Sequence, residues 1–555
     1  MAQASAELKV AIAGFPQPNS KHESILIEQS SQNNMTINTL PRVGWFRLVA
    51  PVTILTSRVK ANQYPGHGSM ESPYLVRWLQ HDQENPLNFP VAMRWVITCL
   101  AALSCFTIAL TSSAYTGGIA SLQSEFGISN SVAQLGVSLY VLGFAIGPLI
   151  SAPLSEIYGR QSVFFVTYGL LVVFNAASAS AKTLPQLLVF RALAGAIGSS
   201  PLANAGGLIA DIFEADNRGL AMGLFSFGPY MGPVVGPIVG GFMGEAAGWR
   251  WPLWFCTILC GVVWILCVSL TPETYAPVLL ERRAAALTAS TGRLHISGLQ
   301  HGPNTRKLSI LLKQGLSRPW VLLFSEPIVL LLSLFMAVVY ATLYMLFAAF
   351  PIVFREQRGW SIGESGLAFT AMAIGMCAAL GFMIIENQRY RRRVQRSPGG
   401  GTPEMRLPVC IVGGIFVPAG LFLFAWTNNP NIHWSVCLLG TVLFGFGNVL
   451  ITLGCFNYLV DSYLIYTSSC MAGSSLLRSV LGAAFPLFTA NMYHRLGSNW
   501  ASSIPAFLAL ACAPLPFIFM KYGLSIRKRC KYSAKAQELQ ERMKASSVTD
   551  NSEGS

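Results

Sequence analysis

The stretch 228–244, GPYMGPVVGPIVGGFMG, is the most informative part of this chain for its fold class. A glycine occurs at every fourth position, and a proline directly follows three of these glycines. In water such a helix would be poor, because an interior glycine costs about 1 kcal/mol and an interior proline about 3 kcal/mol relative to alanine. In a bilayer the backbone has to bond internally, so the helix persists and its glycines form a groove for another helix. Taken alone, the stretch fits a bendable packing helix of any polytopic membrane protein.

The rest of the chain has the composition of a membrane protein. Its 555 residues are 52% hydrophobic and only 11% charged, and the apolar residues form long uncharged blocks. A helix that spans a bilayer needs about 20 mainly apolar residues. We therefore predict an all-α polytopic membrane fold with twelve spans, near 95–115, 132–153, 162–182, 187–210, 220–243, 251–270, 328–350, 366–385, 409–427, 435–457, 468–491 and 502–521.

The basic residues predict how these spans are oriented. Most Arg and Lys residues fall in loops on one side, around Arg160, 282–318, 389–406 and 521–531. The positive-inside rule then places both termini and the central loop in the cytoplasm. The net charge of +14 is thus explained by topology and by attraction to anionic lipid, and it does not indicate a nucleic-acid partner.

The predicted domain organisation follows from the spans. The first 75 residues are rich in Ser, Gln and Asn and are expected to be disordered. The apolar stretch 43–56 is short and broken by Pro51, so we expect an interfacial or unstructured segment there and no additional span. The predicted parts are a cytoplasmic N-terminus (1–75), a juxtamembrane segment (76–94), two six-helix bundles (95–270 and 327–521), a cytoplasmic central loop (271–326) and a cytoplasmic tail (522–555).

The two bundles resemble each other in sequence. Asp211 ends the fourth span and Asp461 ends the tenth, and a proline-containing span follows each. Two similar six-helix halves are typical of transporters whose substrate site lies between the halves, near the middle of the bilayer.

The run 147–160, GPLISAPLSEIYGR, resembles the loop 2–3 signature of the major facilitator superfamily. It has the form found in the fungal drug:proton antiporter branch with twelve spans, although Ala152 and Glu156 replace the usual glycine and aspartate. Arg191 and Gly195 match the arginine motif of this branch. Its antiporter motif is matched by Gly232, Pro233, Gly236, Pro237, Gly240 and Gly241. The resemblance covers about 76–529.

The resemblance implies roles for charged residues at the cytoplasmic helix ends. Loop 2–3 would act in gating through Gly147, Pro148, Glu156, Gly159 and Arg160. A charge relay would be formed by Asp211, Arg218 and Asp461, with Arg160 able to meet Asp211. The alternative is that Glu156 and Arg160 only cap a short loop.

Two arginines fall within predicted spans, where a charge is costly and indicates function. The resemblance implies proton handling or a place in the central cavity for Arg191, with snorkelling to the outer interface as the alternative. Arg478 lies in the middle of its span and is expected to face a water-filled cavity. The aromatic candidates for this cavity are Tyr115, Tyr140, Tyr340 and Tyr344, which suit flat, apolar or cationic ligands unless they serve only packing. Mid-membrane Asp or Glu residues are missing, so the proton carrier is unassigned.

The resemblance therefore implies a monomeric secondary transporter of the plasma membrane. It would export hydrophobic drugs, fungicides or secondary-metabolite toxins by alternating access and proton antiport, with the glycine stripe as the contact between the halves. The proton gradient would supply the energy, and no cofactor, metal or catalytic residue is expected. The chain has no phosphate-binding Gly-Lys-Ser/Thr loop and no hydrolase motif, which argues against an ATP-driven pump and an enzyme. A nutrient or polyamine facilitator, a membrane sensor and a polytopic membrane enzyme are the alternatives.

Overall fold

A computed structural model describes residues 45–49, 53, 55–79, 81–298, 308–396, 402–463, 466–535 and 538. The segment Met1–Gly44 is a separate unit and lies outside the described residues. The end of the predicted C-terminal tail also lies outside them. Predictions for these residues, which include most of the N-terminal segment 1–75, lie outside the described residues and stay predictions.

Helices of the first half follow the predicted apolar blocks. The chain runs through α5 (Val91–Ala114), the short η2 (Tyr115–Gly118) and α6 (Ile119–Phe126), then α7 (Asn130–Tyr158) and α8 (Arg160–Ala179). The fourth span is divided into α9 (Leu184–Gly198) and α10 (Ser200–Ile212), where Pro201 follows the break. The half ends with α11 (Ala215–Ala247) and α12 (Arg250–Leu270).

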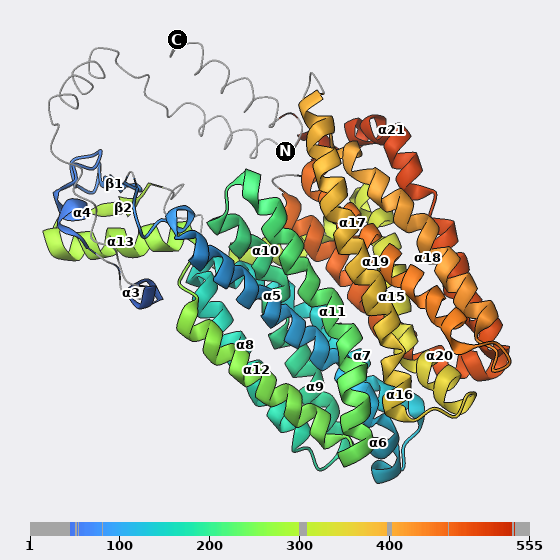
Figure 1. Cartoon of the computed structure of the whole chain (residues 1–555). Helices are drawn as coiled ribbons and strands as arrows, with labels where there is room; N and C mark the ends of the chain where they lie inside the picture. Colours follow the sequence, from blue (N-terminus) through green and yellow to red (C-terminus); the bar gives the residue numbers. More distant parts are fainter. Residues whose placement is uncertain are drawn as a thin grey trace. The chain divides into compact units, whose positions relative to one another are not determined.

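Helices of the second half repeat this order. They are α15 (Pro327–Phe350) with the π-helical η3 (Pro351–Glu356), α16 (Ile362–Leu367) with α17 (Phe369–Arg396), η4 (Pro403–Arg406) with α18 (Leu407–Thr427), α19 (Trp434–Tyr463), α20 (Thr467–Cys512) and α21 (Leu515–Arg529). Figure 1 shows the blue-to-green helices of the first half beside the yellow-to-red helices of the second.

Eleven stretches of the described residues are long and apolar enough to cross a membrane, and the last of them contains 63 residues. Within it, Gly497 has φ 75° and ψ 159°, which is not helical. The Tyr493 and Ser502 hydroxyls on either side lie 2.7 Å apart, whereas nine residues of straight helix would separate their backbones by about 13.5 Å. The chain therefore folds back at Gly497, and the eleventh stretch holds the last two of the twelve predicted spans.

Packing between helices defines two halves and their contact. In the first half α11 packs along α5, and α7 and α8 pack on α9. In the second half α15 packs on α20, and α19 packs on α17 and α18. The halves meet where α7 lies along α20 and where α11 contacts α16 and α17.

The glycine stripe of α11 has a different partner from the one we predicted. A Cβ added at Gly236 would lie 1.9 Å from the Ser113 Oγ of α5, and one at Gly240 would lie 2.1 Å from the Ala114 carbonyl oxygen. The groove is thus confirmed, but the stripe packs against α5 of its own half, so the predicted contact between halves is wrong. The side of α11 that faces α16 carries the neighbouring Gly241, where an added Cβ would lie 3.0 Å from the Ile362 oxygen, and also Pro237 and Phe242. A spacing of four defines a helix face and says nothing about which neighbour covers it.

Part of the segment predicted to be disordered is folded. Short helices α3 (Trp45–Val49) and α4 (Ser57–Ala61) are followed by β1 (Tyr74–Val76). The strand pairs in parallel with β2 (His295–Ser297) of the central loop, and both pack near α13 (Ala276–Thr291). Buried apolar side chains join these pieces: Val59, Tyr64, Val76, Leu280, Ala284 and Leu287. The prediction of disorder up to residue 75 is wrong for this part, because the central loop supplies the apolar partners that the polar N-terminal segment lacks.

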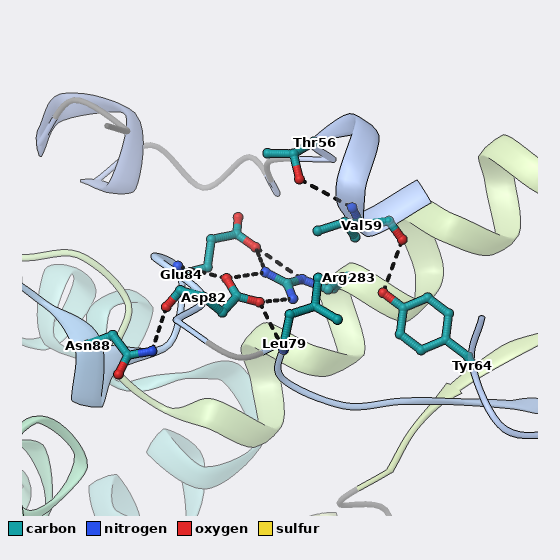
Figure 2. Close-up of polar contacts among 8 residues, drawn as sticks. All are labelled: Thr56, Val59, Tyr64, Leu79, Asp82, Glu84, Asn88 and Arg283. Atoms are coloured by element: carbon teal, nitrogen blue, oxygen red, sulfur yellow. Dashed lines mark hydrogen bonds and ion pairs between the residues drawn. The ribbon is translucent and has the colours of Figure 1, made fainter. Parts of the chain in front are cut away.

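A buried ion cluster closes this subdomain, and we call it the Arg283 clasp (Asp82, Glu84 and Arg283; Figure 2). The Arg283 side chain is only 1% exposed, and its Nη1 and Nη2 lie 2.5 and 3.0 Å from the two oxygens of Asp82. Its Nε donates to Glu84 Oε2 at 3.1 Å. Burial disfavours the charged guanidinium, but the two carboxylates outweigh this, and the pKa of Arg283 is raised. The clasp ties the segment before α5 to the central loop.

The remaining helix of the central loop, α14 (Leu308–Ser325), packs against both α7 and α20. The predicted loop 271–326 therefore contains two helices and a strand among its described residues, and one of these helices touches both halves.

Candidate functional site

The loop between α7 and α8 carries an ion pair. Arg160 begins α8, and its Nε lies 2.5 Å from Asp211 Oδ2 at the end of α10. The meeting of these two residues is thus confirmed, and their role in gating stays a prediction. Glu156 is an exposed side chain near the end of α7. The side chain of Arg218 lies outside the described residues.

Sequence reasoning missed the role of Glu273, which follows the sixth span. Its carboxylate accepts hydrogen bonds from the backbone N–H groups of Arg160 at 3.0 Å and Gln161 at 3.3 Å. Gly159, with φ 92°, makes the turn that exposes these N–H groups, and an added Cβ there would lie 2.1 Å from Glu273 Oε2. An anion at a helix N-terminus is favoured by the helix dipole. The signal in the sequence was the acidic residue directly after Pro272, whose partner could not be read from the chain.

The second half carries an equivalent arrangement. Arg406 begins the ninth span and its Nε lies 3.0 Å from Asp461 Oδ2 at the end of α19. Arg527, at the end of α21, donates from its Nε to Glu404 Oε1 at 2.9 Å. In both halves the start of the third helix is thus paired with the ends of the fourth and the sixth. We call the end of the molecule where these pairs lie the basic end.

Gly147 and Gly195 lie where α7 and α9 approach closely. A Cβ at Gly147 would lie 1.9 Å from the Ala196 oxygen, and one at Gly195 would lie 2.1 Å from the Tyr140 oxygen. Pro148 lies next to Gly147 inside α7. The positions of these residues explain how α7 and α9 pack within the first half. The gating role implied for Gly147 and Pro148 stays a prediction.

Arg191 is fully buried inside the first half, which makes the snorkelling alternative wrong. Its nitrogens donate to three backbone carbonyls, those of Gly136 at 3.1 Å, Thr111 at 3.0 Å and Ser112 at 3.2 Å. Its guanidinium also lies over the rings of Tyr115 and Tyr140, at 5.0 and 4.2 Å from their centroids. Because both tyrosines are buried and bond to backbone carbonyls, they support Arg191 and do not line a cavity.

Tyr340 and Tyr344 of α15 lie where the two halves meet. The Tyr344 hydroxyl is 2.8 Å from Ser112 Oγ of α5. The Tyr340 hydroxyl donates to the Tyr344 hydroxyl at 3.3 Å. Gly482 of α20 packs on Tyr340 and on Val141 of α7, so three helices converge on this ring.

Arg478 of α20 completes this central group. Its guanidinium lies 4.8 Å from the ring centroid of Tyr340 and 5.7 Å from that of Phe456 on α19. The side chain is half-buried, and its Nε is buried without a hydrogen-bond partner among the described residues.

Other polar side chains on the same helices also have buried atoms without described partners. Four of them are Gln134 Oε1 and Ser138 Oγ of α7, Asn448 Nδ2 of α19 and Ser474 Oγ of α20. Ser474 is one turn from Arg478, and Asn448 is two turns from Phe456, so each lies on the same helix face as the central group. We call Arg478, Tyr340, Phe456 and these four residues the central site. In the described part of the chain, no group of three His, Cys, Asp or Glu side chains could hold a metal ion.

Twelve membrane helices in two equivalent halves, with polar side chains between them, define a membrane transporter. Residues 101–486 match the family model described as Major Facilitator Superfamily. The chain belongs to the major facilitator superfamily, and it is a transporter, not an enzyme.

Curated relatives point to the same class. The chain is 50% identical over 523 residues to the "Major facilitator superfamily multidrug transporter mdrA" of Aspergillus fumigatus, covering 93% of this chain and 86% of the relative. It is 51% identical over 508 residues to the "MFS-type efflux pump MFS2" of Trichophyton rubrum, covering 91% and 85%. It is 48% identical over 486 residues to the "Efflux pump FUBT" of Fusarium oxysporum, covering 88% and 82%.

Solved structures confirm the fold. The proton:xylose symporter XylE superposes with a TM-score of 0.57 at 16% sequence identity, covering 78% of this chain and 96% of that one. At this identity the likeness concerns the fold alone.

Proposed function

We propose that this protein exports apolar small molecules, of the kind of drugs, fungicides or secondary-metabolite toxins, out of the cytoplasm. We propose further that it works as a monomer in the plasma membrane, with both termini in the cytoplasm. The observation that carries the proposal is the central site, where Arg478 lies beside the rings of Tyr340 and Phe456 and several buried polar atoms have no described partner. The names of the relatives, a multidrug transporter and two efflux pumps, support the outward direction.

Alternating access would arise from rocking of the two halves about their contact. The ion pairs Arg160–Asp211 and Arg406–Asp461 each join helix ends within one half, so each half can move as a unit. The contact of α7 with α20 and of α11 with α16 would be the surfaces that slide or open.

We propose that an inward flow of protons drives export. In the described spanning helices, Asp and Glu lie beyond the ends of the predicted spans, as Asp211, Glu386 and Asp461 do. A proton carrier is therefore to be sought at the basic end, where Asp211 and Asp461 are already paired with arginines. The interior cations Arg191 and Arg478 also disfavour the polyamine alternative, because a polycation would be repelled there.

The test is efflux from cells that lack their own pumps. Cells that express the protein should retain less of at least one compound from a panel of dyes and azoles, and a protonophore should restore retention. Equal retention in expressing and non-expressing cells, with the protein shown at the cell surface, would contradict export. Efflux that a protonophore leaves unchanged would refute proton coupling alone.

A further inference from the structure

We infer that the central site binds an apolar small molecule with one carboxylate or equivalent acidic group, and that Arg478 holds this acidic group. The inference rests on the proposed function and assigns its class of substrate. The observation that carries it is an arginine in the middle of a predicted span whose guanidinium has no hydrogen-bond partner among the described residues.

The two intramembrane arginines differ in what their guanidinium groups bond to. Arg191 donates to three backbone carbonyls at 3.0 to 3.2 Å and has no solvent exposure. Arg478 donates to no side chain or backbone oxygen of the described residues, and its Nε is buried. A guanidinium has five N–H donors and keeps its charge in proteins. The donors of Arg478 are therefore left for water or for a ligand.

The guanidinium of Arg478 lies inside the molecule, yet it is accessible. Helix α20 packs against both α7 and α15, so its surface is not covered by lipid alone. The side chain lies beside rings from α15 and α19 and is still partly exposed. Part of the Arg478 side chain is therefore accessible to water or to a ligand.

No carboxylate of the described residues neutralises the charge of Arg478. Its close neighbours are Tyr340, Phe456 and, from α11, Tyr230. In the described spanning helices, the carboxylates lie beyond the ends of the predicted spans, and none forms an ion pair with Arg478. An uncompensated cation at this depth is costly, and an acidic ligand would reduce that cost. A carboxylate also matches the planar fork of arginine, which can bind both of its oxygens.

The rest of the central site suits the body of such a ligand. The rings of Tyr340 and Phe456 offer apolar faces next to the guanidinium. Asn448, Gln134 and Ser138 supply neutral polar atoms that have no partner in the described protein. The ligand predicted from this arrangement has a flat apolar body, an acidic end at Arg478 and a few polar substituents.

The test compares three small probes with the same ring but different charge: 1-naphthaleneacetate, 1-naphthaleneacetamide and 1-naphthylmethylamine. Binding to the purified full chain in detergent is measured by isothermal titration calorimetry. We expect the acetate to bind about tenfold more tightly than the amide, because a charge-assisted hydrogen bond is added. The amine should bind most weakly.

The variants are Arg478→Gln, Arg478→Lys and, as a matched control, Arg495→Gln. Arg495 lies on the same helix, is exposed, and loses the same charge on substitution. Arg478→Gln should lower acetate affinity about tenfold and leave amide affinity within about twofold. Arg478→Lys should retain an intermediate preference for the acetate, and Arg495→Gln should bind like the unchanged protein.

Unchanged amide binding also shows that Arg478→Gln still folds. Equal losses for acetate and amide, no loss for either, or no preference for the acetate in the unchanged protein would each overturn the inference. Efflux of the same probes from cells separates the two proposals. Arg478-dependent binding of the acetate without any efflux would refute the proposed function and leave the acidic site standing. Efflux of neutral or cationic probes that Arg478→Gln does not change would refute only the acidic site.

Discussion

At the scale of single residues, Arg191 and Arg478 show that a similar position in the sequence can have different consequences. Both are arginines in predicted spans, and both lie over tyrosine rings. Arg191 donates to three backbone carbonyls of α5 and α7 and so acts as a brace inside one half. Arg478 lies beside Tyr340 and Phe456 and has no hydrogen-bond partner among the described residues.

The brace predicts that Arg191→Ala destabilises the protein. Three buried carbonyls would lose their donor, and we expect a loss of about 3 kcal/mol or more in the free energy of unfolding. The loss is read as a drop of several degrees in the melting temperature of the purified protein in detergent. Lys182→Ala, at an exposed position just before α9, is the control and should melt normally. An unchanged melting temperature for Arg191→Ala would leave proton handling as the better explanation of this residue.

At the scale of helices, the α5–α11 contact depends on the absence of side chains. Gly228, Gly232, Gly236 and Gly240 each face a backbone or side-chain oxygen of α5 that an added Cβ would approach to 2.5 Å or less. The pattern of four predicts the groove directly, because it is a property of one helix. Its partner is a property of the bundle, and for this reason the predicted contact between halves was wrong.

This contact predicts that Gly236→Leu breaks the first half apart. The variant should still enter the membrane, since its hydrophobicity rises, but α5 and α11 should no longer pack. Overpacking of this kind costs about 1–3 kcal/mol, and more where backbone has to move. We expect a smaller fraction of properly folded protein in size-exclusion chromatography, and loss of efflux. Gly223→Leu, on the same helix with nothing within 4 Å of an added Cβ, should behave normally. Equal behaviour of the two variants would contradict the groove.

The Arg283 clasp makes a second prediction at this scale. Arg283→Gln leaves the carboxylates of Asp82 and Glu84 buried beside each other without their cation. Removing one partner of a buried ion pair costs about 3–5 kcal/mol. Hydrogen exchange should therefore become faster in β1 and α13, with little change in α15 or α20. The neighbouring Arg282 is half-exposed, and Arg282→Gln should leave exchange unchanged. If both variants exchange alike, the clasp does not hold the subdomain.

At the scale of the whole molecule, the two halves use the same plan of charges at the basic end. The third helix of each half starts at an arginine paired with the aspartate that ends the fourth helix. A contact with the sixth helix of the half is also repeated. Glu273 accepts from the backbone N–H of Arg160 in the first half, and Arg527 donates to Glu404 in the second. The sequence repeat thus corresponds to a repeat of the Arg–Asp pairs in the structure.

The repeat predicts rescue within a half and none between halves. Arg160→Asp and Asp211→Arg should each lower efflux, and the two together should restore part of it, because the pair is re-formed with its charges exchanged. Arg406→Asp with Asp461→Arg should behave in the same way. Arg160→Asp combined with Asp461→Arg should give no rescue, since these residues lie in different halves. Rescue by this mixed pair, or none by the matched pairs, would show that the charges act through the net field of the basic end.

The sequence by itself determined the class of this protein. Apolar blocks about as long as a bilayer is thick and basic loops on one side are properties of local segments, and they predicted twelve helices in two halves. The family was predicted from the resemblance of the motifs at 147–160, Arg191 and 232–241. Asp211 and Asp461 were recognised because they end corresponding spans. Only the tertiary structure decided which side chains meet: that Arg191 is a brace, that Tyr115 and Tyr140 support it, that Glu273 caps α8, and that residues 55–76 fold onto α13. These contacts join residues far apart in the chain, and helix period and composition carry no information about partners at that distance.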